Sequence, residues 1–201
     1  MKLLSILIPT TPDRMPLYDR LIGELNRQIT DLKLEDQVEI KSLLTAASCS
    51  DPSNLELTTG YKRNRLVESC DGKYYAFIDS DDLPSHNYLE LIMPGIYKDV
   101  DCCSLVGQIY LSGKKGKPFL HSIKYKEWFE DDQFYYRSIN HLNVVKKELV
   151  QHIKFPETNF GEDGNQSYAM RDAGVLKNEY EINEVLYHYH VGFPKHCIEC
   201  A

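Results

Sequence analysis

Apolar runs and amphipathic repeats alternate along the first half of the chain. The run from Leu3 to Ile8 is almost continuously apolar, which predicts a strand that is covered on both faces. Beyond Pro12, apolar residues recur every four positions on one stripe, as in an amphipathic helix. The residues of this stripe are Leu17, Leu21, Leu25 and Ile29. The chain therefore opens with a buried strand followed by a helix packed on it.

The same alternation continues downstream. A strand is expected over Val38–Leu44, a helix over Thr59–Ser69 and a strand over Tyr74–Ile78. Ser85 is expected to cap a helix that buries Leu89, Ile92, Met93 and Ile96. The later pattern predicts a strand over Cys102–Leu111, a loop or hairpin over Ser112–Tyr125, a short helix within Gly161–Gly174 and a last strand over Glu181–Val191. We expect one α/β domain over residues 1–201, with a mixed, mainly parallel sheet.

Composition narrows the class of protein. The 201 residues are 42% hydrophobic and 26% charged, which is ordinary globular usage. A net charge of −7 argues against broad nucleic-acid binding. The lysines from Lys114 to Lys126 could still follow a phosphate backbone, or form a solvated hairpin.

No apolar stretch is long enough to span a membrane. The six cysteines lack framework spacing, which favours a reducing cytoplasm, and the pair Cys197 and Cys200 is a weak zinc half-site or part of an unstructured tail.

Candidate chemistry gathers where predicted strands end. Asp79, Asp81 and Asp82 directly follow the third strand, and three carboxylates this close repel one another unless a cation compensates. Oxygen ligands favour Mg²⁺ or Mn²⁺. The alternative is a solvated acidic turn. In open α/β sheets ligands bind beyond the carboxyl ends of the strands, which favours the cation site.

Two histidines near the end of the last strand add to this picture. His188 and His190 are two residues apart and therefore share a strand face, while Tyr187 and Tyr189 would point to the opposite, packed face. The imidazoles could complete a metal shell or hold a diphosphate. A purely structural role is the alternative.

Three blocks of the sequence resemble the family-2 glycosyltransferases of the GT-A fold. They are SILIPTTPDR, GYKRNRLVESCDGKYYAFIDSDD and FGEDGNQSYAMRDAG, and the likeness spans about residues 3 to 190. The middle block is the most specific, because Gly60, Arg63-Asn64, Gly72 and the acidic run follow in family order and spacing. The resemblance implies an enzyme that moves a sugar from a nucleotide-sugar to an acceptor hydroxyl with inversion.

The resemblance also implies the residues of the donor site. Asp81 would be the direct ligand of the cation. Asp79, also assigned to the metal site, would lie nearer the nucleotide, and His190 and His188 would be further metal ligands. The residues assigned to the nucleotide-sugar are Pro9, Thr10, Thr11, Arg14, Asp51, Arg63, Asn64, Asp79, Ser80 and Asp82. From the residues alone, Arg14 could equally form a surface ion pair. Family members commonly carry a base-recognising aspartate after the second strand; here only Asp51 is near, so uridine is a less secure donor base.

Glu162 and Asp163 match the family's acidic pair, whose aspartate takes the proton from the acceptor hydroxyl. A flexible turn between Gly161 and Gly164 would hold this carboxylate. The alternative is an acidic first turn of a helix, which complements the helix dipole. Trp128, His141 and Asn143 fall where the acceptor-side segment of such enzymes lies, although a single tryptophan is equally plausible in a core.

These expectations combine into a metal-dependent, cytoplasmic, inverting glycosyltransferase. Residues 1–100 would bind the nucleotide-sugar, favoured to be a UDP-sugar, residues 101–192 would bind the acceptor, and residues 193–201 form a short tail. The acceptor stays open between a glycan, a lipid-linked sugar, a protein and a hydroxymethylated DNA base. A sugar-nucleotidyl transferase is the first alternative, but residues 9–16 contain no glycine. A nucleotide-sugar-binding domain without turnover is the second.

Overall fold

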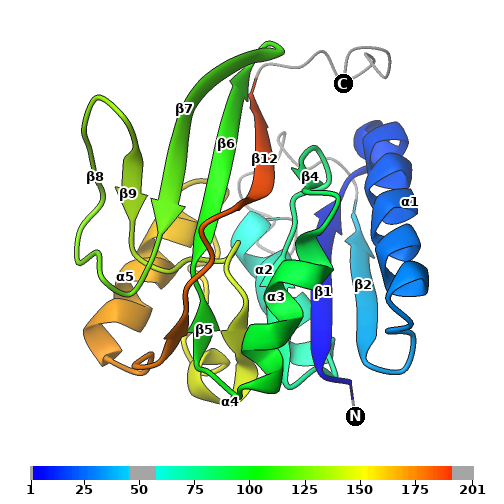
Figure 1. Cartoon of the computed structure of the whole chain (residues 1–201), viewed down its shortest axis with the longest axis horizontal. Helices are drawn as coiled ribbons and strands as arrows, with labels where there is room; N and C mark the ends of the chain where they lie inside the picture. The colour runs from blue at the N-terminus through cyan, green and yellow to red at the C-terminus, as the bar shows by residue number, and fades with distance from the viewer. Residues whose placement is uncertain (1, 46–57, 192–201) are drawn as a thin grey trace.

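The computed structural model describes residues 2–45 and 58–191, and within them the strands form two sheets (Figure 1). The first sheet has the order β11-β5-β10-β3-β1-β2. Its strands are β1 (Leu4–Thr10), β2 (Val38–Leu44), β3 (Tyr74–Phe77), β5 (Cys102–Cys103), β10 (Val145–Lys146) and β11 (Glu179–Tyr180). β1 pairs in parallel with both β2 and β3, whereas β10 pairs antiparallel with β3. The sheet is therefore mixed, with a parallel N-terminal half as predicted.

Helices cover both faces of this sheet. Alternate residues of β1 enter different cores: Ile6 and Ile8 join the core under α1 (Met15–Asp31) and α3 (Tyr88–Tyr97), whereas Leu7 joins the core under α2 (Thr59–Ser69) and α5 (Glu162–Ala173). Two short elements, η1 (Pro12–Arg14) and α4 (Lys147–Val150), complete this region. Because β1 is buried on both faces, its sequence is a nearly unbroken apolar run.

The second sheet has the order β4-β12-β6-β7-β9-β8. Its strands are β4 (Leu83–Pro84), β6 (Leu105–Leu111), β7 (Lys114–His121), β8 (Phe129–Glu130), β9 (Tyr135–Arg137) and β12 (Val185–Val191). In Figure 1, β6, β7 and β12 stand beside the upper end of β1, so the two sheets meet near the carboxyl end of the parallel strands. That edge is where an α/β sheet binds its ligands.

Two details of the predicted elements are wrong. The strand expected over Cys102–Leu111 is divided at Ser104 between the two sheets, because the Ser104 amide and hydroxyl bond to Tyr180 and Ile182. The helix expected after Ser85 begins at Tyr88, and the Ser85 hydroxyl has no hydrogen-bond partner within the described residues. The buried amide of Gln28 on α1 takes the capping role: it accepts from the Leu89 amide and donates to the Ser85 carbonyl.

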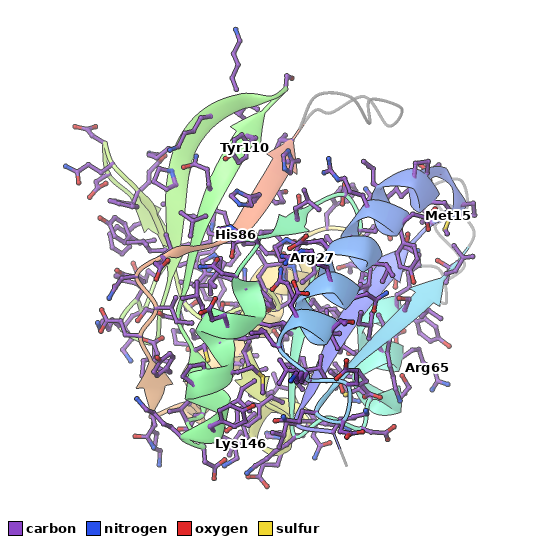
Figure 2. All side chains as sticks on the ribbon, turned by 45° about the vertical axis from the view of Figure 1, so that its right-hand side comes forward. Met15, Arg27, Arg65, His86, Tyr110 and Lys146 are labelled. Carbon is purple, nitrogen blue, oxygen red and sulfur yellow. The ribbon has the colours of Figure 1, made fainter. Side chains whose placement is uncertain are left out.

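Arg27, the neighbour of Gln28, reinforces this attachment of α1. Its Nη2 atom donates to the His86 carbonyl at 2.8 Å, and both side chains are labelled close together in Figure 2. The turn between β4 and α3 is thereby held against α1 by two consecutive side chains. Because the acidic run lies just before this turn, α1 helps to fix the place of Asp81 and Asp82.

Candidate functional site

A cavity of about 320 Å³ lies where the two sheets meet. Its walls come from the end of β3, the start of α5 and the facing strands of the second sheet. Six of the residues predicted from the sequence line it together: Arg63, Asp79, Trp128, His141, Glu162 and Asp163. The acidic run and the acidic pair, about 80 positions apart in the chain, therefore contribute to one site.

A buried guanidinium joins the two acidic groups. Arg63, on α2, donates from Nη2 to Asp79 Oδ1 at 3.0 Å and from Nε to Glu162 Oε1 at 3.3 Å. The guanidinium carbon of Arg63, Cζ, also lies 5.0 Å from the ring centre of Phe77. Burial acts to lower the pKa of Arg63, but the nearby carboxylates outweigh it and raise that pKa. Arg63 is thus a fixed positive charge between the two carboxylates.

Asp79 is ionised in this setting. Burial by itself would raise the pKa of its carboxyl, but Arg63 and His141 hold that pKa well below the usual range.

His141 lies between the two acidic ends of the cavity. Its Nε2 is 3.6 Å from Asp79 Oδ2 and its Nδ1 is 3.9 Å from Asp163 Oδ2. Both ring nitrogens are buried and have no hydrogen-bond partner within the described residues.

The first turn of α5 presents the acidic pair. Gly161 caps the helix with φ of 77°, a left-handed conformation that glycine adopts without strain. Glu162 is buried against Arg63, whereas the side chain of Asp163 is about one-third exposed and faces the cavity. The expectation of a flexible turn is wrong, because Asp163 is already helical. Both predicted settings hold together: the pair is the acidic start of a helix, and it lines the cavity.

Helix α2 positions the loop that leads into α5. Both polar atoms of the Asn64 side-chain amide bond the backbone of Phe155, each at 2.9 Å. The Gly60 amide donates to the Thr158 carbonyl and the Thr59 amide to Asn159 Oδ1, both at 3.1 Å. Asn64 was predicted to bind the nucleotide-sugar. In the structure its amide acts on the protein backbone and so positions the start of α5.

The other two carboxylates of the acidic run have different partners. Asp81 Oδ1 lies 2.9 Å from Arg14 Nη1, and the two side chains are 34% and 37% exposed. Asp82 is 2% exposed and accepts hydrogen bonds from the Tyr187 hydroxyl and the His190 amide. Burial and the neighbouring Asp79 raise the pKa of both carboxyls, most strongly that of Asp82. Asp82 therefore anchors β12.

These placements bear on a divalent cation. Within the described residues, no group of three or more His, Cys, Asp or Glu side chains converges as a metal site. Asp79 faces Arg63, Asp82 faces Tyr187, and Asp81 is the most exposed of the three carboxylates. Mg²⁺ is commonly held by one or two carboxylates together with waters and substrate phosphates. The residues fit a cation that Asp81 would hold together with waters and substrate phosphates. Within the described residues they do not form a site made of protein ligands alone.

The remaining residues predicted to bind the donor lie near the ends of β1 and β3, apart from Asp51. Pro9 is half-buried in β1, and Thr11 Oγ1 bonds Asp13 Oδ1 at 2.5 Å. Thr10 and Ser80 are buried, and their hydroxyls have no hydrogen-bond partner among the residues that the structure describes. Asp51, Cys197 and Cys200 lie outside the described residues.

The histidine pair lies on the strand face opposite Tyr187. The ring of His190 stacks on Tyr110 of β6 with centres 5.1 Å apart, and the ring of His188 is 5.7 Å from the same tyrosine (Figure 2 labels Tyr110). Tyr187 is fully buried, as expected for the packed face. The expectation is wrong for Tyr189, which is 40% exposed and lines the cavity. A metal role for the two imidazoles stays a prediction.

The predicted acceptor-side residues divide into two groups. Trp128 and His141 line the cavity. Asn143 is buried behind it, donates to the Cys103 carbonyl at 2.9 Å and accepts from the Asn140 amide at 3.1 Å. Its Oδ1 atom also lies 3.0 Å from His121 Nδ1. Asn143 therefore positions cavity residues from outside the cavity.

Several cavity residues were not predicted from the sequence. Among them are His121, Arg137, Phe160 and Tyr189. His121 and Arg137 belong to β7 and β9 of the second sheet, whose pairing carries no sequence motif. Phe160 is 92% exposed at the cavity rim, next to the predicted acidic pair. An exposed aromatic residue beside that pair is the one signal that could have identified it.

The described residues contain no helix that is both long and apolar enough to cross a membrane. No protein-family model and no curated protein matches the chain. Solved structures do match. S. aureus TarS 1–349 in complex with UDP-GlcNAc aligns with a TM-score of 0.60 at 16% identity, over 96% of this chain and 60% of TarS 1–349. Its complex with UDP aligns with a TM-score of 0.56 at 15% identity, over 95% of this chain and 61% of that one.

The chain thus spans about 60% of the length of TarS 1–349. At this level of identity the likeness concerns the fold. Two mixed sheets, helices on both faces of the first sheet, and a cavity at the junction are the features that position the site. The chain is a mixed α/β protein with a Rossmann-like GT-A fold.

Proposed function

We propose that this protein is an inverting glycosyltransferase that transfers a sugar from a UDP-sugar to an acceptor hydroxyl. The observation that carries the proposal is the cavity shared by Asp79, which follows β3, and Asp163, which lies in the first turn of α5. A donor site and a base must lie this close for a direct displacement. The TarS complexes with UDP-GlcNAc and UDP support a uridine nucleotide as the donor.

Asp163 acts as the general base in this proposal. Its carboxylate takes the proton of the acceptor hydroxyl while the hydroxyl oxygen bonds to the anomeric carbon of the donor. The bond from that carbon to the diphosphate oxygen breaks, and UDP leaves. A single displacement inverts the anomeric configuration. Glu162 does not share this role, because Arg63 engages its carboxylate.

The protein supplies positioning and charge around this step. Arg63 bridges Asp79 and Glu162. The two hydrogen bonds between the Asn64 amide and the Phe155 backbone, here called the Asn64 clamp, hold the loop before Asp163. A bound Mg²⁺ or Mn²⁺, held by Asp81 with the donor phosphates and water, would neutralise the departing diphosphate. Arg14, paired with Asp81, would donate to the same phosphates.

Donor turnover tests the proposal most directly. Purified protein is incubated with UDP-GlcNAc, with and without MnCl₂, and released UDP is measured. Slow release of UDP by hydrolysis is expected even without an acceptor. Saturable binding of UDP-GlcNAc in calorimetry with no release of UDP under any condition would instead indicate a binding domain without turnover.

Replacing Asp163 by asparagine tests the base. Asparagine preserves the size and hydrogen bonding of the side chain but cannot take the proton. We therefore expect Asp163→Asn to bind UDP-GlcNAc with nearly unchanged affinity while transfer or hydrolysis falls about 100-fold or more. Calorimetry measures the affinity, and UDP release measures the rate.

Asp172→Asn is the matched control, because Asp172 lies exposed at the far end of the same helix and pairs with Arg171. Its rate should equal that of the wild type. An Asp163→Asn variant with a wild-type rate, or a product whose anomeric configuration is retained, would contradict the assignment.

A further inference from the structure

Arg137 is a cation in the cavity to which the proposed chemistry gives no role. It ends β9, lines the cavity with Asp163 and is half-buried. None of the ion pairs among the described residues includes it. The other arginine of the cavity, Arg63, is held between two carboxylates. Lys117, on the adjacent strand, is likewise paired with Glu130.

The guanidinium of Arg137 rests on a prearranged aromatic surface. Its central carbon lies 4.2 Å from the ring centre of Trp128 and 5.8 Å from that of Tyr135. A guanidinium over aromatic rings keeps its N–H groups available for an anion. Arg137 is therefore positioned by aromatic contacts.

Trp128 is fixed in turn by a chain of hydrogen bonds. Its Nε1 donates to Ser138 Oγ at 3.2 Å, and Ser138 Oγ lies 2.8 Å from Ser167 Oγ on α5. Both serines are buried. A Cβ atom added at Gly164 would lie 3.4 Å from the Trp128 ring, so the tryptophan packs on the residue next to Asp163. The platform under Arg137 therefore has a defined position relative to the proposed base.

The wall beside Arg137 is neutral. His121 is buried, and burial lowers the pKa of its imidazole to about 3, with Arg137 contributing to the same shift. Its Nδ1 faces Asn143 Oδ1, which can only accept, so Nδ1 carries the proton and Nε2 is an acceptor. A neutral acceptor beside a stacked cation suits a group with both hydroxyls and a negative charge.

From these contacts we propose that Arg137 and Trp128 form a subsite for an anionic group of the acceptor. The acceptor is thus a sugar that bears a carboxylate or a phosphate near its attacking hydroxyl. That the molecule bound here is the acceptor rests on the proposed function. The subsite lies on the Asp163 side of the cavity. Arg14 and Asp81 are not among the residues that line the cavity. The donor diphosphate would be held near Asp81, away from Arg137.

Trp128 makes the subsite directly observable, because it is the single tryptophan of the chain. Its fluorescence is titrated with glucose, glucuronate and glucose 6-phosphate, which share one ring and differ in the group at C6. We expect at least one charged sugar to bind about tenfold or more tightly than glucose. Whichever charged sugar binds identifies the anion as carboxylate or phosphate.

Two variants decide whether Arg137 is responsible. Arg137→Gln should abolish the preference for the charged sugar while its thermal midpoint and its affinity for UDP stay at wild-type values. Arg171→Gln is the matched control, since Arg171 also stacks on an aromatic ring, that of Tyr168, but is paired with Asp172. It should keep the preference.

Three results would overturn the subsite. One is equal binding of the three sugars, and another is no binding of any of them. The third is an Arg137→Gln variant whose affinity for UDP falls as much as its affinity for the charged sugar, which would assign Arg137 to the donor diphosphate. A protein that prefers the charged sugar but never releases UDP from UDP-GlcNAc would refute the proposed function and not the subsite.

Discussion

Asp79, Asp81 and Asp82 follow the same strand but have three different electrostatic environments. The pKa of Asp79 is held low by Arg63 and His141 against the effect of burial, whereas burial raises the pKa of Asp82. Asp81, partly exposed, has Arg14 as its partner. A charge buried without compensation is costly, and each of the three carboxylates has a different partner. Asp79 forms a buried ion pair, Asp82 anchors β12, and Asp81 is the carboxylate most open to a ligand.

Asp81→Asn tests the residue that is open to a ligand. An exposed ion pair contributes little to stability, and the substitution also relieves repulsion from Asp79, so the thermal midpoint should stay the same or rise slightly. If Asp81 holds the cation, the strengthening of UDP-GlcNAc binding by MnCl₂ should disappear. Calorimetry with and without MnCl₂ measures both affinities. A variant that keeps the full manganese effect would remove Asp81 from the cation site.

Residue identity alone does not reveal which member of a motif contacts a ligand. Arg63 and Asn64 are neighbours and were assigned to the donor site together. On a helix they point in different directions, so Arg63 reaches the cavity while Asn64 holds the Phe155 backbone. Arg63 lines the cavity, and the assignment of both residues to a donor site stays a prediction. The division of their roles depends on the rotation of α2, which no local pattern encodes.

At the scale of elements, the contact between α2 and the loop before α5 links the two halves of the site. A Cβ atom at Gly60 would lie 1.8 Å from the Pro156 carbonyl oxygen and 2.8 Å from its carbon. Both are backbone atoms and cannot rotate away. Glycine at this position therefore allows α2 to approach the loop closely enough for the Asn64 clamp to form.

Gly60→Ala and Gly23→Ala form a matched pair that measures this contact. Both glycines are helical, and alanine at the exposed Gly23 of α1 meets nothing within 4 Å. Gly23→Ala should stabilise the protein by about 0.5–1 kcal/mol through helix propensity. Gly60→Ala should destabilise it by about 1–3 kcal/mol, because the loop must move.

Urea unfolding provides both free energies, and UDP release reports on the site. Gly60→Ala should also lower turnover, since the displaced loop leads into Asp163. If the two alanine variants have the same stability, the close approach of α2 to the loop is not what glycine at position 60 permits.

The elements were predictable where burial or amphipathic spacing leaves a pattern. β2 and α2 have the predicted limits, and β1 and α1 lie where the apolar runs placed them. β12 shows what a pattern omits. Its alternation separates the histidines from the tyrosines, but which pair faces the cavity depends on how the strand pairs with β6, whose pairing is irregular between Val185 and Tyr187.

At the scale of the whole molecule, the site exists because two sheets meet. The parallel strands β1, β2 and β3 and the helices α1, α2 and α3 follow from the sequence pattern, and with them the places of Asp79 and Arg63. The short strands β10 and β11 of the same sheet were not predicted. The second sheet contributes His121, Arg137 and Tyr189 through strands that are short or half-exposed. Their approach to Asp163 is a long-range packing result. The sequence therefore predicted the cavity residues Arg63, Asp79 and Asp163 but not most of the opposite wall.

The buried imidazole of His121 couples this junction to the stability of the whole protein. Burial lowers its pKa to about 3 in the folded state, from 6.5 for an exposed histidine. Below about pH 6.5 the unfolded chain therefore binds a proton at this residue that the folded chain does not bind. The contribution of His121 to stability is complete above that pH and is lost as the pH falls toward 3. At about 1.4 kcal/mol per pH unit, it amounts to about 2 kcal/mol between pH 7.5 and pH 5.

His121→Gln should remove this dependence. Glutamine cannot be protonated, and its amide nitrogen can still donate to Asn143 Oδ1. We expect the free energy of unfolding in urea to fall by about 2 kcal/mol less in the variant than in the wild type between pH 7.5 and pH 5. His152→Gln removes an exposed imidazole and controls for the loss of a histidine. Because the test compares slopes, a constant loss of stability from imperfect packing of glutamine does not affect it. Equal slopes for the wild type and His121→Gln would mean that His121 takes up its proton in the folded protein, and that the wall beside Arg137 becomes charged in mild acid.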